Sequence, residues 1–246
     1  MLSSKNNKDF IQLINGNYLW EEMTLWEYLK EGNIPSHWKN FFIENQQTLF
    51  NISQNLLLKN TQKIYPPINK VFRAFIPLKK IKVVILGQDP YHNGSAVGYC
   101  FSVLSGNSIN PSLMNIYKEL KNEGYDITKD GNLTHWVNQG CFLLNTALTV
   151  EKGCPNSHTS YWNDFTANTV KYVVDNCENI VWLLMGSKAQ KFKQFISSSH
   201  HTICTSHPSP FSAYKGYRDL PAFIGSGVFL KINDYLTKTS RKPIYW

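Results

Sequence analysis

The chain has 246 residues, enough for one large α/β domain or two small ones, and its composition of 42% apolar, 14% aromatic and 17% charged residues excludes a disordered chain. The apolar runs are far too short to cross a bilayer, and the N-terminus lacks the apolar stretch of a secretory signal, so we expect a soluble intracellular protein. Lys and Arg outnumber Asp and Glu by 25 to 17, a formal charge of +8 that favours nucleic acid first, and an acidic membrane surface second, as a partner.

Five cysteines are scattered along the chain without a CxxC pair, at positions 100, 141, 154, 177 and 204. An odd and scattered set argues against a disulfide framework and against a zinc site. We therefore expect reduced cysteines that serve as small core residues.

The N-terminal third of the chain predicts helices. The segment YLWEEMTLWEYLKEG predicts a short helix that ends near Gly32, and residues 36–60 carry aromatic and aliphatic side chains at roughly helical spacing. The YPP at 65–67 breaks this pattern and predicts a loop. The segment at 81–86, which contains VVIL, then predicts a strand buried on both faces.

Asn110 and Pro111 predict the N-cap and the first position of a helix that ends at Gly124. Between them, four apolar residues follow the spacing of a stripe that faces a core: Leu113, Ile116, Tyr117 and Leu120. The remaining predicted elements are strands at 140–145, 179–186 and 201–210 and helices at 160–176, 187–196 and about 227–238.

Strands that alternate with helices predict a single α/β domain with a central, mostly parallel four-stranded sheet flanked by helices. Ligands of such open sheets bind outside the carboxyl ends of the strands. Polar residues stand at each of these ends: Gln88 and Asp89, Asn145, Gly186 and Ser187, and His207. We therefore expect an acid, an amide, a Gly-Ser turn and an imidazole to gather at one rim and to line a pocket.

Each of these residues also has a structural explanation. Asp89 precedes Pro90, and the pattern alone leaves a turn aspartate and a catalytic carboxylate equally open. Asn145 lies in an apolar run and must find hydrogen-bond partners, so a structural amide is an alternative. His207, taken alone, is better explained as a satisfied, half-buried imidazole. The templates GxxxxGK[ST], GxGxxG, GxSxG and HExxH are absent from the sequence.

Three motifs follow one another at the ends of predicted strands: GQDPYH with a following CFSV, FLLNTALTV, and HPSPFSAYKGY. Together they resemble the family-1 uracil-DNA glycosylases, and IYPP, NPSLMNIYKEL, LLMGSKAQK and KPIYW are similar to that family as well. The likeness begins at about residue 20, so we expect an N-terminal extension at 1–19 and a glycosylase domain at 20–246. The resemblance implies an enzyme that flips uracil out of DNA and hydrolyses its N-glycosidic bond. This leaves an abasic site and starts base excision repair, with no metal and no organic cofactor.

The resemblance also implies a role for each matching residue. Asp89 would orient or activate the attacking water and stabilise positive charge on the sugar, and His207 would donate a hydrogen bond to uracil O2. Asn145 would read uracil O4 and N3–H through its amide. The stacking ring, the wall against a thymine methyl and a backbone contact to the base would come from Phe101, Tyr91 and Gln88.

The contacts to DNA would surround this pocket. The resemblance implies phosphate and backbone contacts by Pro111, Ser112, Gly186, Ser187, Ser209 and Pro210. Phe211 falls where the intercalating wedge of the family sits, which is usually a leucine. The loop between Tyr91 and Phe101 is one residue shorter than the common form, and the proline-rich DNA loop is reduced to SINPS. None of these three departures removes a catalytic group.

The implied partner is uracil-containing DNA, single- or double-stranded, bound by a monomer that a proteinaceous uracil-glycosylase inhibitor could block, with no membrane involved. The compartment would be the cytoplasm of a bacterium, or the nucleus (or host nucleus) for a eukaryotic or viral protein. Two rival hypotheses remain open: a non-catalytic DNA-binding module on the same scaffold, and a glycosylase that acts on other damaged bases.

Overall fold

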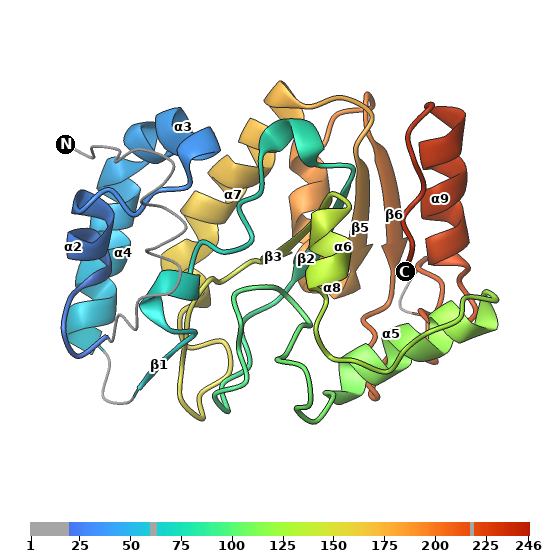
Figure 1. The fold of residues 1–246 in the computed structure, drawn as a ribbon, viewed down its shortest axis with the longest axis horizontal. Coiled ribbons are helices and arrows are strands. Elements are labelled where there is room, and N and C mark those ends of the chain that lie inside the picture. Colours follow the sequence, from blue (N-terminus) through green and yellow to red (C-terminus); the bar gives the residue numbers. More distant parts are fainter. Residues whose placement is uncertain (1–19, 60–62, 217–218) are drawn as a thin grey trace.

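The computed structural model describes residues 20–59, 63–216 and 219–246, so the predicted extension at 1–19 lies outside the described residues. Four strands form the central sheet in the order β3-β2-β5-β6 (Figure 1). They are β2 (Val83–Gly87), β3 (Cys141–Asn145), β5 (Val181–Met185) and β6 (His201–Thr205). All three neighbouring pairs are parallel. The predicted α/β fold with a four-stranded parallel sheet is therefore confirmed.

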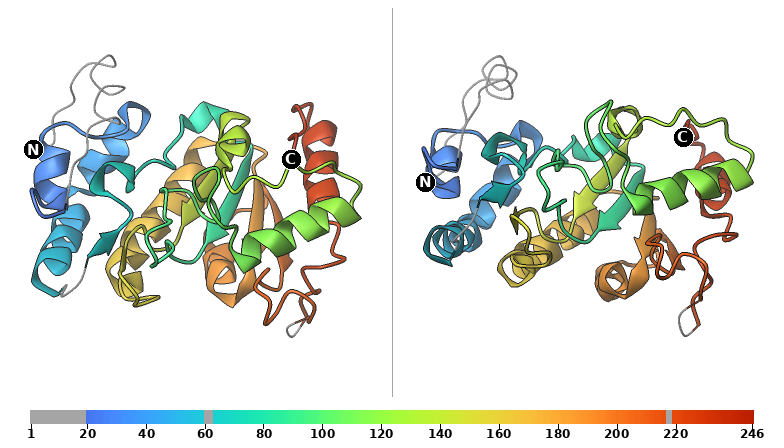
Figure 2. Two further views of the ribbon diagram at one scale, coloured as in Figure 1. Left: turned by 60° about the horizontal axis from the view of Figure 1, so that its bottom comes forward. Right: turned by 90° about the horizontal axis from the view of Figure 1, so that it is seen from below.

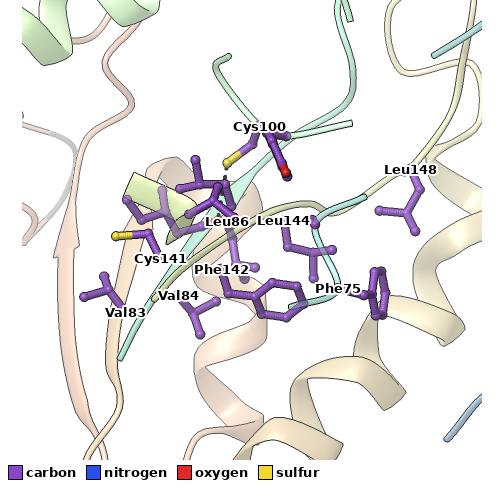
Figure 3. Packing of buried hydrophobic residues seen from close by; sticks show 14 of the residues in the cluster. Phe75, Val83, Val84, Leu86, Cys100, Cys141, Phe142, Leu144 and Leu148 are labelled. Atoms are coloured by element: carbon purple, nitrogen blue, oxygen red, sulfur yellow. Dashed lines mark hydrogen bonds between the residues drawn. The ribbon is translucent and has the colours of Figure 1, made fainter. Parts of the chain in front are cut away.

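The three inner strands are apolar because both of their faces are covered. Every residue of β2, β3 and β5 is buried, which is typical of parallel strands between two layers of helices. Figure 3 shows side chains of β2 and β3, including Leu86 and Phe142, packed together with Phe75 and Leu148. Burial of this kind stabilises the fold by roughly 25 cal/mol per Å² of apolar surface and fixes the strand ends in space.

Helices cover both faces of the sheet (Figure 2). One face carries α7 (Thr159–Asn176), α8 (Gly186–Gln190) and the 3₁₀ helix η4 (Lys191–Phe195). The other face carries α6 (Thr134–Asn138) and α9 (Val228–Lys238). The N-terminal helix α2 (Leu25–Lys30) packs against α4 (Gln46–Lys59), which in turn packs against α7.

Helix α5 (Pro111–Asn122) runs along the lower right of Figure 1, near the carboxyl ends of the strands. Its four predicted core residues are all buried, and Pro111 stands at its first position as expected. Asn110 is the N-cap residue, but its side chain makes no capping hydrogen bond. Glu119 is also fully buried, because its carboxylate accepts hydrogen bonds from Gly225 and Gly227 N–H groups ahead of α9.

The single helical segment expected over 36–60 is wrong in detail. It consists of η1 (Ser36–Trp38), α3 (Lys39–Glu44) and α4, with a break at Asn45. The Asn45 amide donates to the carbonyl of Phe41 at 2.9 Å, so the side chain competes with helix continuation at this point. The first helix ends as predicted, with Lys30 as its last residue and Gly32 following at a φ of 90°, which favours glycine, but it begins only at Leu25 and is shorter than the predicted segment.

Three other boundaries differ from the predictions. Tyr65 was expected in a loop but belongs to β1 (Ile64–Tyr65), which pairs antiparallel with β4 (Val150–Glu151). The strand expected at 201–210 ends at Thr205, since Pro208 and Pro210 lack the N–H groups that a strand interior needs. The helix expected at 187–196 is split into α8 and the tighter η4. The 3₁₀ helices η2 (Ile68–Lys70) and η3 (Leu78–Lys80) precede β2.

The cysteines are all reduced, and their burial only partly matches the prediction. Cys100 and Cys141 are buried and Cys177 and Cys204 are half-buried, but Cys154 is exposed on the loop after β4. In the described part of the chain, each helix is too short or too polar to span a bilayer.

Candidate active site

The carboxyl ends of the strands converge as the sequence predicts. Gly87, the last residue of β2, lies opposite Asn145, the last residue of β3, so Gln88 and Asp89 emerge beside the amide. His207 follows the end of β6 by two residues. Together with Phe101, Tyr91 and Ser112 these side chains line one cavity of about 160 Å³. This is well below the roughly 300–1,000 Å³ of pockets for drug-sized ligands, so the cavity suits one small ring.

A larger cavity of about 430 Å³ lies between α2, α4 and β1, lined among others by Trp20, Met23 and Leu56. It is remote from the strand ends and has neither the imidazole nor the amide of the smaller one. We therefore assign the chemistry to the cavity at the carboxyl edge of the sheet, where open α/β sheets bind their ligands.

The amide of Asn145 is held in place by the shape of its surroundings. Asn145 is only 8% exposed, and its side chain forms no hydrogen bond with the residues that the structure describes. A Cβ added at Gly87 would overlap Asn145 Oδ1 and would lie 2.5 Å from Cβ of Cys100. Glycine at position 87 is therefore what allows the amide to lie against the end of β2. A nearly buried amide without a protein partner is available to a ligand.

Phe101 has an unusual backbone that directs its ring into the cavity wall. Its φ is 62°, in the left-handed region that a bulky residue rarely adopts. The Tyr91 hydroxyl donates to the Phe101 carbonyl at 3.0 Å, and the Cys100 N–H donates to Leu143 of β3 at 3.1 Å. The centroid of the Phe101 ring lies 6.0 Å from that of His207. Tyr91 and Phe101 are thus tied together across the shortened loop.

Asp89 is half-buried and is oriented by a residue that the sequence did not single out. The Asn156 N–H donates to Asp89 Oδ2 at 2.7 Å, which leaves Oδ1 as the oxygen without this bond. Asn156 has a φ of 67°, a conformation that Asn tolerates better than most residues. Its side-chain oxygen accepts from Gln88 Nε2 and, at 2.5 Å, from Lys188 Nζ.

Asn156 and Lys188 are the functional candidates that sequence reasoning missed. Asn156 is 67 residues away from Asp89 along the chain, in a loop that carries no periodic pattern. Lys188 directly follows the Gly-Ser turn at the start of α8, and this position was the only feature of the sequence that could have placed it at the site.

Among the described residues no acceptor meets His207 Nε2, and this is the nitrogen that carries the proton of the neutral ring. The Ser209 N–H donates to Nδ1 at 3.0 Å, so a neutral imidazole has its proton on Nε2. Burial lowers the pKa of His207, and the positive charge of Lys188 lowers it further. Gly186 has a φ of 84°, and a Cβ there would lie 2.9 Å from His207 Cβ, so the Gly-Ser turn packs directly on the imidazole. His207 is thus a neutral hydrogen-bond donor at the cavity.

The residues expected to contact DNA lie on three segments, and some of them line this cavity or a neighbouring one. Ser112 at the start of α5 lines the cavity, and Ser209 lines a neighbouring cavity of about 290 Å³ together with Gly186 and Ser187. Pro111 and Pro210 are exposed. Phe211 is 92% exposed, an unusual state for so large an apolar side chain. His92 is exposed and also borders the cavity.

The residues that the structure describes include no group of three or more His, Cys, Asp or Glu side chains that could hold a metal ion. What they do form is a ring-sized cavity with a carboxylate, an amide and a neutral imidazole, on a chain with a formal charge of +8. These features fit an enzyme that acts on one base of a nucleic acid.

The comparisons with known proteins identify the family. The model of the family described as "Uracil DNA glycosylase superfamily" matches residues 74–236. A uracil-DNA glycosylase of Psychromonas ingrahamii is 43% identical over 220 residues, which cover 85% of this chain and 99% of that protein. One of Buchnera aphidicola is 46% identical over 220 residues, covering 85% and 94%. The chain therefore belongs to the uracil-DNA glycosylase family.

Solved structures agree with this assignment. The crystal structure of mimivirus uracil-DNA glycosylase superposes with a TM-score of 0.81 at 29% identity, covering 100% of this chain and 95% of that one. A variant of the mimivirus enzyme in complex with UGI gives a TM-score of 0.79 at 32% identity, covering 87% and 88%. The predicted function is confirmed: the chain is a monofunctional DNA glycosylase, a hydrolase that excises uracil from DNA and starts repair.

Proposed function

We propose that Asp89, Asn145 and His207 excise a single uracil that is extruded from DNA into the cavity at the carboxyl edge of the sheet. One observation carries this assignment: the three side chains, from the ends of β2, β3 and β6, line the same cavity of about 160 Å³ with Phe101. The roles below follow from the chemistry of the bond that breaks and the groups that face it.

Cleavage of a glycosidic bond passes through an oxocarbenium-like state, with positive charge on the sugar and negative charge on the departing base. Asp89 supplies the negative charge for the sugar side, and Oδ1, the oxygen that does not accept the Asn156 N–H, is the one we assign to the attacking water. His207 Nε2–H is the donor for uracil O2, and a neutral donor suits a base that leaves as an anion. One such preorganised group contributes roughly 2.7–4 kcal/mol to transition-state stabilisation.

Asn145 is the residue we assign to base recognition. Its amide has both a donor and an acceptor, which match uracil O4 and N3–H, whereas cytosine presents the reverse pattern. A buried amide left unpaired by the wrong base is costly, so the mismatch is rejected. Tyr91 excludes the thymine methyl by its bulk, Phe101 stacks on the ring, and Gln88 contacts the base by its backbone.

The contacts to DNA complete the proposal. Extruding a base from a duplex costs a few kcal/mol, which an apolar side chain in the vacated stack offsets. Phe211 is exposed and apolar, which supports this wedge role. We assign the contacts with the phosphates on either side of the uracil to six residues: Pro111, Ser112, Gly186, Ser187, Ser209 and Pro210. The basic excess adds a sequence-independent attraction that weakens with salt.

The comparisons also bear on the partners and the location of the protein. The mimivirus structure in complex with UGI supports inhibition of this chain by a protein of that kind. We also propose that the chain acts as a monomer, on single- and double-stranded DNA. The bacterial relatives support a cytoplasmic location.

Replacing the carboxylate tests the catalytic assignment. Asp89→Asn keeps the shape of the side chain but removes its charge, so we expect most turnover to be lost while DNA binding remains. Release of uracil from an oligonucleotide in EDTA, followed by alkaline scission at the abasic site, measures turnover, and a gel shift measures binding. Near-normal turnover of Asp89→Asn would show that the role given to Asp89 is wrong. A wild-type protein that binds without scission would instead favour the DNA-binding module.

A second substitution tests base recognition. Asn145→Asp places a carboxyl at the same position, and its protonated form reverses the hydrogen-bonding pattern of the amide. We expect measurable release of cytosine from DNA, in addition to weakened release of uracil. A panel of oligonucleotides with uracil, cytosine, thymine and other damaged bases also tests the hypothesis of altered specificity. No cytosine release over long incubation would contradict the assignment of Asn145.

A further inference from the structure

The segment that carries Phe211 is a compact turn with its own internal hydrogen bonds. The Ala213 N–H donates to the Ser209 carbonyl at 2.8 Å, and the Ser212 hydroxyl donates to the His207 carbonyl at 2.8 Å. The hydroxyls of Ser209 and Ser212 lie 2.8 Å apart. The turn therefore projects Phe211 from a backbone that is braced from within, and its orientation as a body depends on what holds its two ends.

Helix α5 holds both ends of this turn. Asn115 Nδ2 donates to the Pro208 carbonyl at 2.8 Å, and Lys118 Nζ donates to the Tyr214 hydroxyl at 2.9 Å. Lys118 Nζ also lies 5.0 Å from the centroid of the Tyr214 ring, close enough for a cation–π contact. Asn115 and Lys118 are three residues apart on one helix and thus share a face. Figure 2 shows α5 beside the chain that follows β6.

The positions of these contacts indicate that they do more than stabilise the fold. Lys118 is exposed and Tyr214 is 54% exposed, so their bond contributes little to global stability. The contacts lie on either side of Phe211, and α5 itself begins with Pro111 and Ser112, two residues assigned above to DNA. One rigid helix therefore connects a phosphate contact to both ends of the wedge.

We propose that Asn115 and Lys118 are positioning residues that hold Phe211 in register with the DNA contacts at the start of α5. They act on the extrusion of the base from a duplex and have no part in the hydrolysis. This inference rests on the proposed wedge role of Phe211. It implies that a loosened turn lets Phe211 miss the vacated stack, so the extruded state is lost before cleavage.

The test compares duplex and single-stranded oligonucleotides of one sequence. Lys118→Met keeps the length of the side chain but removes the donor and the charge, and Tyr214→Phe removes only the acceptor. We expect each to lower kcat/KM on duplex roughly two- to tenfold, the worth of one hydrogen bond, with little change on single strands. Asn115→Ala is expected to behave in the same way. Lys121→Met, one turn further along the same helix, is the control because Lys121 makes no hydrogen bond to the described residues of the turn, and it should leave both substrates unaffected.

Two further readouts separate positioning from its alternatives. A 2-aminopurine beside the uracil reports extrusion in stopped flow, and Lys118→Met is expected to slow this signal on duplex. In a Phe211→Ala background, Lys118→Met is expected to cause no additional loss, because the wedge it positions is gone. Equal losses on both substrates with a weaker salt dependence would identify Lys118 as a phosphate contact and overturn the inference. An undiminished further loss in the Phe211→Ala background would overturn it too. If Phe211→Ala alone spares duplex cleavage, the wedge assignment itself fails, which is a distinguishable result.

Discussion

Gly87→Ala introduces a single methyl group at the point where β2 and β3 end side by side. The backbone at Gly87 does not have a left-handed conformation, so an alanine there is disfavoured only because its Cβ would collide with neighbouring atoms. An added Cβ would overlap Asn145 Oδ1 and would lie 2.5 Å from Cβ of Cys100. Cys100 is fully buried, and its thiol donates to the Ile85 carbonyl at 3.4 Å, so it has little room to move (Figure 3). The amide of Asn145 must therefore give way.

The expected loss of activity follows from the role proposed for the Asn145 amide in binding uracil. A displaced Asn145 leaves uracil O4 and N3–H without their partners in a closed cavity. Loss of one preorganised hydrogen-bonding group in an active site typically costs about 10²–10³ in rate, or roughly 2.7–4 kcal/mol. The overpacking itself is expected to lower the free energy of unfolding by about 1–3 kcal/mol. We therefore expect a large loss of activity with a protein that remains folded.

Single-turnover release of uracil from an oligonucleotide measures the activity, and urea unfolding measures the stability. Gly124→Ala is a matched control, because Gly124 has a φ of 88° and an added Cβ meets no atom within 4 Å. The control is expected to lose about 1 kcal/mol of stability, from the left-handed backbone alone, with full activity. A Gly87→Ala variant with near-normal kcat/KM would refute the claim that Gly87 positions the amide.

Two predictions concern pH. Lys188→Met removes a positive charge that lowers the pKa of His207, so this pKa is expected to rise. Since the neutral imidazole is the proposed active form, the acidic limb of kcat/KM against pH should move to higher pH; an unchanged limb would argue against a neutral His207 donor. His158 is buried, and burial lowers its pKa to about 4, while the unfolded chain keeps about 6.5. The unfolded state thus binds the proton more tightly, and stability is expected to fall by roughly 3 kcal/mol as pH drops from about 6.5 to about 4. His158→Gln should flatten this limb in urea unfolding at a series of pH values, and an equal slope in both proteins would contradict the account.

Much of the fold was predictable because its strands are buried on both faces. Continuous apolar runs such as that of β2 leave few alternatives, and the polar residues at their ends then mark the rim of a parallel sheet. The convergence of Asp89, Asn145 and His207 on one cavity follows from that topology. The apolar stripe of α5 was equally clear from its spacing.

The features that were missed depend on contacts between residues far apart in the chain. Asn156 reaches Asp89 through a backbone N–H, which no side-chain pattern reveals. The Glu119 side chain can be buried because N–H groups more than 100 residues away along the chain donate hydrogen bonds to it. The break at Asn45 depends on a local side-chain bond that competes with the helix, and the pairing of β1 with β4 involves only two residues of each strand.

A crystal structure of the Asp89→Asn variant with a uracil-containing duplex would show whether the three side chains meet one extruded base in the cavity. We expect an extruded uracil stacked on Phe101, with its O4 and N3–H on the Asn145 amide and its O2 at His207 Nε2. We also expect the ring of Phe211 in the space that the base has left. A uracil that remains stacked in the duplex, or that binds outside this cavity, would contradict the account.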